Sequence, residues 1–180
     1  MISYRQLEAS ELTRVGEIDR TERIDTLYVQ RGTELERVQG DFSASAWREG
    51  DGPHTVEEQI NGCEYYLAAG GTAIGAFSGE RLVGIGIVLP HLRPGVAQLA
   101  YLHVSNGFRG EGIGTHLSQK LEQIARAAGD HVMVVSAAPS PRTVGFYRHR
   151  GFTPSAEPLP ELLELEPEDV HMEKCLGQTK

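Results

Sequence analysis

The chain has 180 residues, with 17 Lys and Arg against 25 Asp and Glu, and a formal net charge of −8 at pH 7. This acidic balance argues against nucleic acid as the main partner, and no stretch approaches the ~20 apolar residues that span a membrane. Cys63 and Cys175 have neither metal-ligand nor disulfide-framework spacing, and the seven histidines are scattered, so we expect no metal site and a reducing, cytoplasmic location.

The hydrophobic content of 39% supplies enough core for one domain over residues 1–180. Its first ninety residues alternate short apolar runs with turn residues. The expected elements are an edge strand over 4–7, a helix over 10–19, a hairpin over 26–38, a loop over 51–53, a helix over 56–66, and a second hairpin formed by 73–77 and 81–89. Glycines at 75, 84 and 86 in the second hairpin indicate close backbone approach or a bulge.

The central segment predicts a strand over Val96–Val104, a helix over 113–128 that Gly129 ends, and a buried strand over 131–136. A strand, a helix and a strand within about forty residues form a βαβ unit, so the two strands should be parallel. Residues 140–151 then predict a helix, with Ser140 as its N-cap, Pro141 at the first helical position and Gly151 closing its end. A connection over 158–167 and a final antiparallel strand over 169–175 complete the chain.

The turn from Arg109 to Gly114 joins the first of these strands to its helix. Its three glycines let the backbone approach a ligand, and the unpaired N–H groups of the helix start attract anions, with Arg109 adding a mobile positive charge. A dinucleotide fingerprint fails, because Thr115 or Leu117 stands where its third glycine is needed. A P-loop fails too, because no Gly-Lys-Ser/Thr follows. A plain glycine turn without a ligand remains the alternative.

Two motifs in this segment resemble those of the GNAT superfamily of N-acetyltransferases. Arg109-x-x-Gly112-x-Gly114 matches the pyrophosphate loop of that family, Arg/Gln-x-x-Gly-x-Gly/Ala. Phe146-Tyr147 and Gly151-Phe152 match its later Phe/Leu-Tyr-x-x-x-Gly-Phe motif in order and spacing. Ser140 and Thr143 replace the usual Asn and Ala, which puts the side-chain contact at 140 in doubt.

The resemblance is tight over residues 96–152 and looser elsewhere. Asp19–Glu22 and Glu166–His171 look like signatures of a bacterial subgroup, for which the resemblance implies no particular substrate. It implies an α/β fold with a mixed, mostly antiparallel twisted sheet flanked by helices, whose central parallel strands splay apart around the cofactor. Residues 1–95 would then carry the acceptor-side segments, 96–152 the acetyl-CoA core, and 153–180 the connection and final strand.

The resemblance implies transfer of an acetyl group from acetyl-CoA to a primary amine, by direct attack in a ternary complex. The amine would belong to a small molecule, a peptide or a protein, and a homodimer is common among relatives. The implied cofactor-binding residues are Leu102, His103, Val104, Arg109, Gly110, Glu111, Gly112, Ile113, Gly114, Thr115, Ser140, Thr143, Phe146 and Tyr147. Glu111 should point to solvent.

Among the catalytic candidates, the resemblance implies that Tyr147 donates a proton or a hydrogen bond to the leaving thiolate. The backbone N–H of Val104 or a neighbour would stabilise the oxyanion. The helix pattern alone favours a packing role for Tyr147, one turn after Val144. The presence of the glycine-turn motif upstream of the Phe146-Tyr147 motif favours the catalytic role.

The base is left open by the sequence. Relatives often place a glutamate on this strand, whereas alternation here puts Leu99, Tyr101 and His103 on one face and Gln98, Ala100 and Leu102 on the other. His103 has a suitable ordinary pKa, but a lone histidine in an apolar strand is more often a core residue. Glu22, before the first hairpin, is a rival candidate or a solvated charge, and a chain of waters without a dedicated base is the default.

Two other functions compete with the enzyme. One is a binding module that holds or senses acyl-CoA after losing catalysis, which the missing strand glutamate favours and the retained Tyr147 opposes. The other is a phosphate- or nucleotide-binding α/β domain without acyl chemistry, which the failed nucleotide motifs oppose. Binding of coenzyme A without turnover would favour the former, and no binding would favour the latter.

Overall fold

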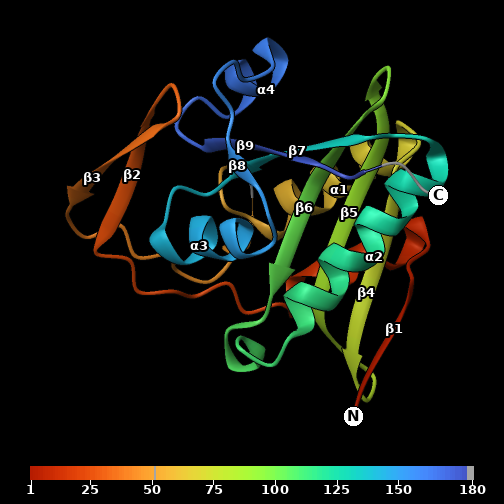
Figure 1. Cartoon of the computed structure of the whole chain (residues 1–180). Coiled ribbons are helices and arrows are strands. Elements are labelled where there is room, and N and C mark those ends of the chain that lie inside the picture. The colour runs from red at the N-terminus through yellow and green to blue at the C-terminus, as the bar shows by residue number, and fades with distance from the viewer. Residues whose placement is uncertain (51, 178–180) are drawn as a thin grey trace.

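A mixed sheet forms the centre of the computed structural model, which describes residues 1–50 and 52–177 (Figure 1). Within these ranges the sheet has seven strands, and every neighbouring pair is antiparallel except the parallel pair β6–β7. Their order is β1 (Ile2–Gln6), β4 (Thr72–Ser78), β5 (Arg81–Arg93), β6 (Val96–Val104), β7 (Val132–Ala137), β9 (Val170–Cys175) and β8 (Thr153–Pro154). The expected fold class and the parallel central pair are confirmed.

Helices cover both faces of this sheet (Figure 1). On one face α2 (Ile113–Ala128) and α3 (Pro141–His149) contribute to the larger core cluster. On the other face η1 (Ala9–Glu17) and α1 (Val56–Ala68) form the second cluster with β4 and β5. No helix in the described part of the chain is long and apolar enough to cross a membrane.

Glycines of β5 set how closely α2 approaches the sheet. A Cβ atom added at Gly86 would lie 2.9 Å from Leu121 Cδ1, and one at Gly84 would lie 3.1 Å from Ile113 Cγ2. This confirms the expected close approach, and the register of β4 and β5 also shifts at Ala76, as the glycine pattern predicted. Because Ile113 is the first residue of α2, this packing also fixes the glycine turn before it.

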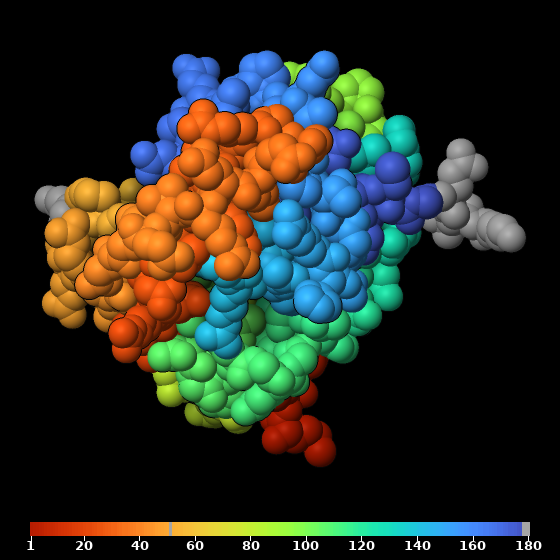
Figure 2. Space-filling view, turned by 60° about the vertical axis from the view of Figure 1, so that its left-hand side comes forward, coloured from red at the N-terminus to blue at the C-terminus, as the bar shows by residue number. Residues whose placement is uncertain are grey.

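The first expected hairpin is confirmed as β2 (Thr26–Arg31) and β3 (Glu34–Gln39), a two-stranded sheet apart from the main one. The Tyr28 N–H donates to the Pro139 carbonyl at 2.8 Å. The Gln30 amide donates to the Ser155 carbonyl at 3.0 Å and accepts from the His171 N–H at 2.8 Å. Figure 2 shows the hairpin, in orange, lying beside the blue segments that follow β7.

The expected helix over 10–19 is confirmed as the 3₁₀ helix η1, whose period of three suits the buried Leu12, Val15 and Ile18. One expectation about local structure was wrong. The connection over 158–167 contains α4 (Pro160–Leu165), because Pro160 stands at the first helical position and starts the helix rather than breaking it.

A bulge in β6 overturns the expected alternation of side chains. Ile87 pairs with Tyr101 but its neighbour Val88 pairs with Leu99, so Ala100 is the extra residue. Leu99 therefore packs with the α2 face, whereas Ala100 and Tyr101 pack with the α1 face. The prediction that Leu99 shares a face with Tyr101 and His103 was wrong, because strict alternation ignores an inserted residue.

Candidate functional site

The glycine turn presents free backbone N–H groups at the start of α2. Gly110 and Gly112 have φ of 85° and 81°, in the left-handed region that favours glycine. Gly112 is the N-cap and provides no side-chain hydrogen bond, so the first N–H groups of α2, from Ile113 onward, lack intrahelical partners. A Cβ atom at Gly110 or Gly112 would meet nothing within 4 Å. The geometry suits a phosphate group lying directly against this backbone.

Beside this turn, β6 and β7 diverge (Figure 1). Their pairing runs only from Val96 opposite Val132 to Leu99 opposite Val135. The Ser105 N–H donates to the Val83 carbonyl of β5 at 2.8 Å, so strand alternation turns the backbone groups of Val104 away from β5, toward the diverging side. By the same alternation the backbone of Leu102 faces that side. These are the positions predicted for backbone contacts to the cofactor arm and to the oxyanion.

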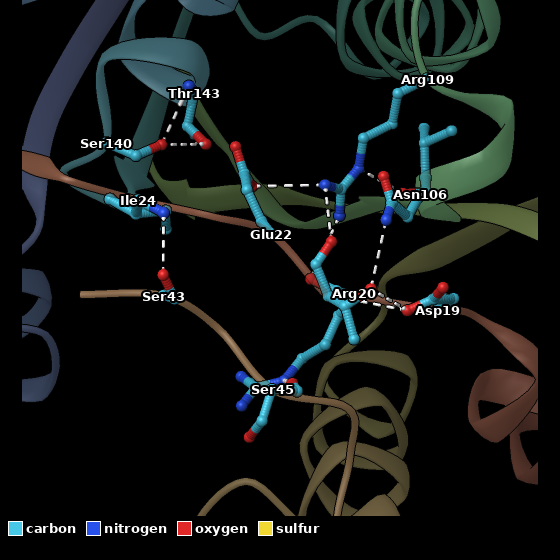
Figure 3. A network of polar contacts seen from close by, with 12 residues as sticks. Asp19, Arg20, Glu22, Ile24, Ser43, Ser45, Asn106, Arg109, Ser140 and Thr143 are labelled. Carbon is cyan, nitrogen blue, oxygen red and sulfur yellow. Dashed lines mark hydrogen bonds and ion pairs between the residues drawn. The ribbon is translucent and has the colours of Figure 1, made fainter. Parts of the chain in front are cut away.

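Arg109 is held in place, contrary to the expected mobile charge (Figure 3). Its guanidinium donates to the Val104 carbonyl at 3.0 Å and to the Thr21 and Arg20 carbonyls, each at 3.2 Å. It also lies 3.4 Å from a Glu22 carboxylate oxygen, and its side chain is 14% exposed. Four acceptors around one guanidinium leave it little freedom, so Arg109 joins the N-terminal segment to the glycine turn.

The segment Asp19–Glu22 is attached to the same turn by further hydrogen bonds. The Asp19 carboxylate accepts from the Thr21 N–H and hydroxyl, and the Asn106 N–H donates to the Asp19 carbonyl at 2.7 Å. The Asn106 side chain also donates to the Thr21 hydroxyl at 3.2 Å. The Asp-Arg-Thr-Glu pattern at residues 19–22 therefore fixes where the N-terminal segment crosses the glycine turn.

At the start of α3, the polar side chains are used within the helix. The Ser140 hydroxyl accepts from the Thr143 N–H at 3.2 Å and donates to the Thr143 hydroxyl at 3.0 Å (Figure 3). Ser140 is thus an N-cap, as its sequence position predicted, with its hydroxyl occupied by Thr143. Phe146 approaches the glycine turn, since a Cβ atom added at Gly114 would lie 3.4 Å from its ring.

Tyr147 lies in the core, 4% exposed, with ring centroids 5.2 Å from Phe146 and 5.4 Å from Phe152. Burial, and the nearby Asp169 carboxylate, raise the pKa of the Tyr147 phenol well above its ordinary value. The phenol therefore keeps its proton at neutral pH. At neutral pH it can donate a hydrogen bond or a proton, as a weaker acid than an ordinary phenol, but it cannot act as a base.

The two candidate bases are differently placed. Burial, with the guanidinium groups of Arg109 and Arg20 nearby, lowers the pKa of His103 to about 4. Its ring lies 4.7 Å from that of Tyr101 and 5.5 Å from that of Trp47, centroid to centroid. His103 is therefore neutral at pH 7 but a weak base. Glu22 is paired with Arg109, and Glu111 is exposed at the turn.

A cavity of about 400 Å³ opens beside the glycine turn. It lies between the crossing N-terminal segment, the end of β6 and the start of α3, and three arginines line it. Its lining residues are Glu22, Arg23, Ile24, Asp25, Thr26, Asn106, Arg109, Ser140, Pro141 and Arg142. With three arginines against two carboxylates, we call it the arginine cavity.

A second cavity, of about 630 Å³, lies between the β2–β3 hairpin and the chain that leads into β9. Its walls are mostly apolar and carry the carboxylates of Glu168 and Asp169, with no lysine or arginine among its described lining residues. These are Leu27, Tyr28, Val29, Gln30, Gly32, Val38, Phe42, Pro139, Ala156, Pro158, Leu163, Pro167, Glu168, Asp169 and His171. We call it the acidic cavity.

Asp169 is the residue that sequence reasoning missed. Burial, together with the Glu166 and Glu168 carboxylates, raises its pKa to about 7. The only available signal was its place in the Glu166–His171 pattern, which says nothing about burial. Within the described residues, no group of three or more His, Cys, Asp or Glu could hold a metal ion.

Known proteins resemble this chain in both sequence pattern and fold. A family model described as the acetyltransferase (GNAT) family matches residues 39–152. No curated protein sequence matches the chain significantly. Among solved structures, nourseothricin acetyltransferase is 17% identical, with a TM-score of 0.72 over 98% of this chain and 99% of that one.

Two further structures show how varied the acceptors of similar folds are. A Bacillus anthracis protein described as a streptothricin acetyltransferase, solved with acetyl coenzyme A, is 15% identical, with a TM-score of 0.68 over 96% of each chain. The ribosomal-protein-S18-alanine N-acetyltransferase from Escherichia coli is 14% identical, with a TM-score of 0.61 over 100% of this chain and 97% of that one. At these identities the likeness shows the fold alone.

Proposed function

Since this chain belongs to the GNAT acetyltransferase family, we propose that it transfers an acetyl group from acetyl-CoA to a primary amine by direct attack in a ternary complex. The observation that supports this most is the open glycine turn beside the diverging strands β6 and β7. The residues present fit acetyl-CoA: free N–H groups at Ile113 and beyond suit its pyrophosphate, and the backbone of Leu102 and Val104 suits its pantetheine arm.

When bound, acetyl-CoA supplies a thioester carbonyl that an amine can attack. The Val104 N–H, or that of a neighbour, stabilises negative charge on the carbonyl oxygen, and one such donor typically contributes about 3 kcal/mol to a transition state. Tyr147 gives its phenolic proton to the departing sulfur; the raised pKa keeps that proton present at every working pH, although it also makes the phenol a weaker acid than usual. In this proposal, the Val104 N–H and the Tyr147 phenol are the two catalytic groups.

The test is calorimetric titration with acetyl-CoA, followed by measurement of thiol release with a panel of amines. We expect one micromolar site and release of one thiol per amine acetylated. Binding without release from any amine would favour the acyl-CoA-binding module. No binding to a folded sample would overturn the cofactor assignment and the enzyme with it.

A further inference from the structure

The acidic cavity adjoins the proposed cofactor site without overlapping it. Its lining includes Tyr28 and Pro139, and the arginine cavity begins one or two residues away, at Thr26 and Ser140. The hydrogen bond from the Tyr28 N–H to the Pro139 carbonyl therefore lies in the wall between the cavities. The acidic cavity also reaches Asp169, whose charge acts on the proposed proton donor Tyr147.

The charges of this cavity suit a cation. Glu168 and Asp169 are acidic, and His171 is neutral at pH 7 because burial lowers its pKa. The His171 Nε2 bonds to the Glu166 carbonyl at 2.9 Å, so this nitrogen carries the proton and the other, 3.2 Å from the Ser136 hydroxyl, accepts. His171 thus fixes the turn that carries Asp169, and the Asp169 N–H closes that turn onto the Glu166 carbonyl at 3.2 Å.

Among the described residues, Asp169 has no counterion. No hydrogen bond or ion pair of the described residues reaches its carboxylate, although the side chain is half-buried. The groups that act on it are Glu166 and Glu168 of the same turn and Tyr147 of α3, and none of them is positive. A half-buried carboxylate in such surroundings is costly to ionise, and an ammonium group brought by a ligand would relieve that cost.

The other walls indicate what carries the ammonium group. Leu27, Val29, Val38, Phe42 and Leu163 line the cavity, and Val29, Val38 and Leu163 are 41%, 39% and 44% exposed. Exposed apolar side chains gathered around a concave site are typical of a binding surface for an apolar group. A carboxylate on the ligand would be repelled by Glu168 and Asp169, so an amino acid fits less well than a simple amine.

We propose that the acidic cavity binds the acceptor, a primary amine on an uncharged apolar body, and that Asp169 is the base that receives the ammonium proton. This rests on the proposed function. Asp169 first takes one proton from the ammonium group, which leaves a neutral amine. The nitrogen then forms the C–N bond to the acetyl carbon while the C–S bond breaks.

The remaining protons balance within the site. The sulfur takes the Tyr147 proton, and the phenolate recovers one from the new amide nitrogen. Asp169 releases its proton to water, so one ammonium ion and one thioester give one amide, one thiol and one proton. His103 and Glu22 take no part in this route.

The experiment compares 2-phenylethylamine with phenylalanine, which differs by one carboxylate, and with ethanolamine, which lacks the apolar body. Acetyl-CoA binding is measured first. Absence of binding would count against the proposed function, and can therefore be told apart from a wrong assignment of the acceptor. We expect kcat/KM for 2-phenylethylamine to exceed that for either comparison amine at least 30-fold. Equal or better use of phenylalanine or of ethanolamine, with acetyl-CoA bound, would overturn the inference and leave the acetyltransferase assignment unaffected.

Asp169→Asn tests the base. We expect kcat/KM to fall at least 100-fold, acetyl-CoA affinity to stay within 3-fold, and the rise of wild-type kcat/KM with pH near 7 to vanish. Glu164→Gln, which removes one exposed charge from the neighbouring α4 outside the cavity, should leave all three unchanged. An Asp169→Asn variant with full activity, or with the same pH profile as wild type, would contradict the assignment.

Discussion

The arginine cavity and the acidic cavity share a wall but differ in almost every property that matters for binding. One is lined by three arginines and adjoins backbone N–H groups, whereas the other is apolar with two carboxylates and no described lysine or arginine. A negative net charge of −8 would not predict either environment. The contrast teaches that local placement of a few charges, and not overall composition, decides which ligand each side of the wall accepts.

The largest expected effect on the difference between the two cavities comes from filling the space beside the glycine turn, where acetyl-CoA would bind. Gly112→Leu adds a side chain where the pyrophosphate would lie, and we expect acetyl-CoA affinity to fall more than 100-fold by calorimetry. Gly129→Leu is the matched control, because Gly129 ends the same helix with φ of 95°, so the backbone strain is similar. Equal affinity of both variants for acetyl-CoA would mean that the turn is structural only.

Tyr147 links the two cavities, since α3 begins at one and the charge of the other acts on its phenol. We expect Tyr147→Phe to lower kcat about 100-fold, because general-acid help to a leaving group is typically of this size. Acetyl-CoA affinity should change little, since the ring is kept. An unchanged kcat in thiol-release assays would mean that Tyr147 only packs in the core.

Arg109→Met would remove the hydrogen bonds that join the N-terminal segment to the end of β6 beside the arginine cavity. The carbonyls of Arg20, Thr21 and Val104 lose their donor, and we expect about 2 kcal/mol of lost stability in denaturant unfolding. Acetyl-CoA affinity should fall about tenfold, because the turn is no longer held. Glu22→Gln keeps those three bonds and removes only the ion pair, so its unfolding free energy should change by less than about 0.5 kcal/mol.

The smallest effect concerns stability on the acidic side. The pKa of Asp169 is higher when folded, about 7, than the roughly 3.9 of an unfolded aspartate, so ionisation opposes folding. The wild type thus loses stability as pH rises from about 4 to 7 and stays at the lower value above 7. We expect Asp169→Asn to be more stable by about 1–2 kcal/mol at pH 8, after allowance for partial solvent screening, and by nothing at pH 3. Thermal unfolding at both pH values checks the sign.

The segment 96–152 was predictable because its signals are local. Gly129 ends α2, Ser140 and Pro141 start α3, and Gly151 follows it with φ of 88°. The bulge at Ala100 was not predictable, since it depends on how β5 and β6 pair, which strict alternation cannot express. For α4 the error came from interpreting the whole of residues 158–167 as a connection, although a proline at the first helical position can start a helix.

The candidate site divides in the same way. The glycine turn and the backbone of Val104 could be placed from the sequence, because they follow from where one strand ends and one helix begins. The restraint of Arg109 could not, as its acceptors come from Arg20 and Thr21, almost ninety residues away. Asp169 was missed for a related reason: an unpaired, half-buried carboxylate is a property of tertiary surroundings.

The hydrogen bond between Tyr28 and Pro139 also has a kinetic consequence. Because acetyl-CoA would enter from the arginine side of this bond and the amine from the acidic side, neither has to enter or leave past the other. We therefore expect random order of addition rather than an obligatory sequence. In steady-state inhibition, coenzyme A would then compete with acetyl-CoA alone, and the acetylated amine with the amine alone.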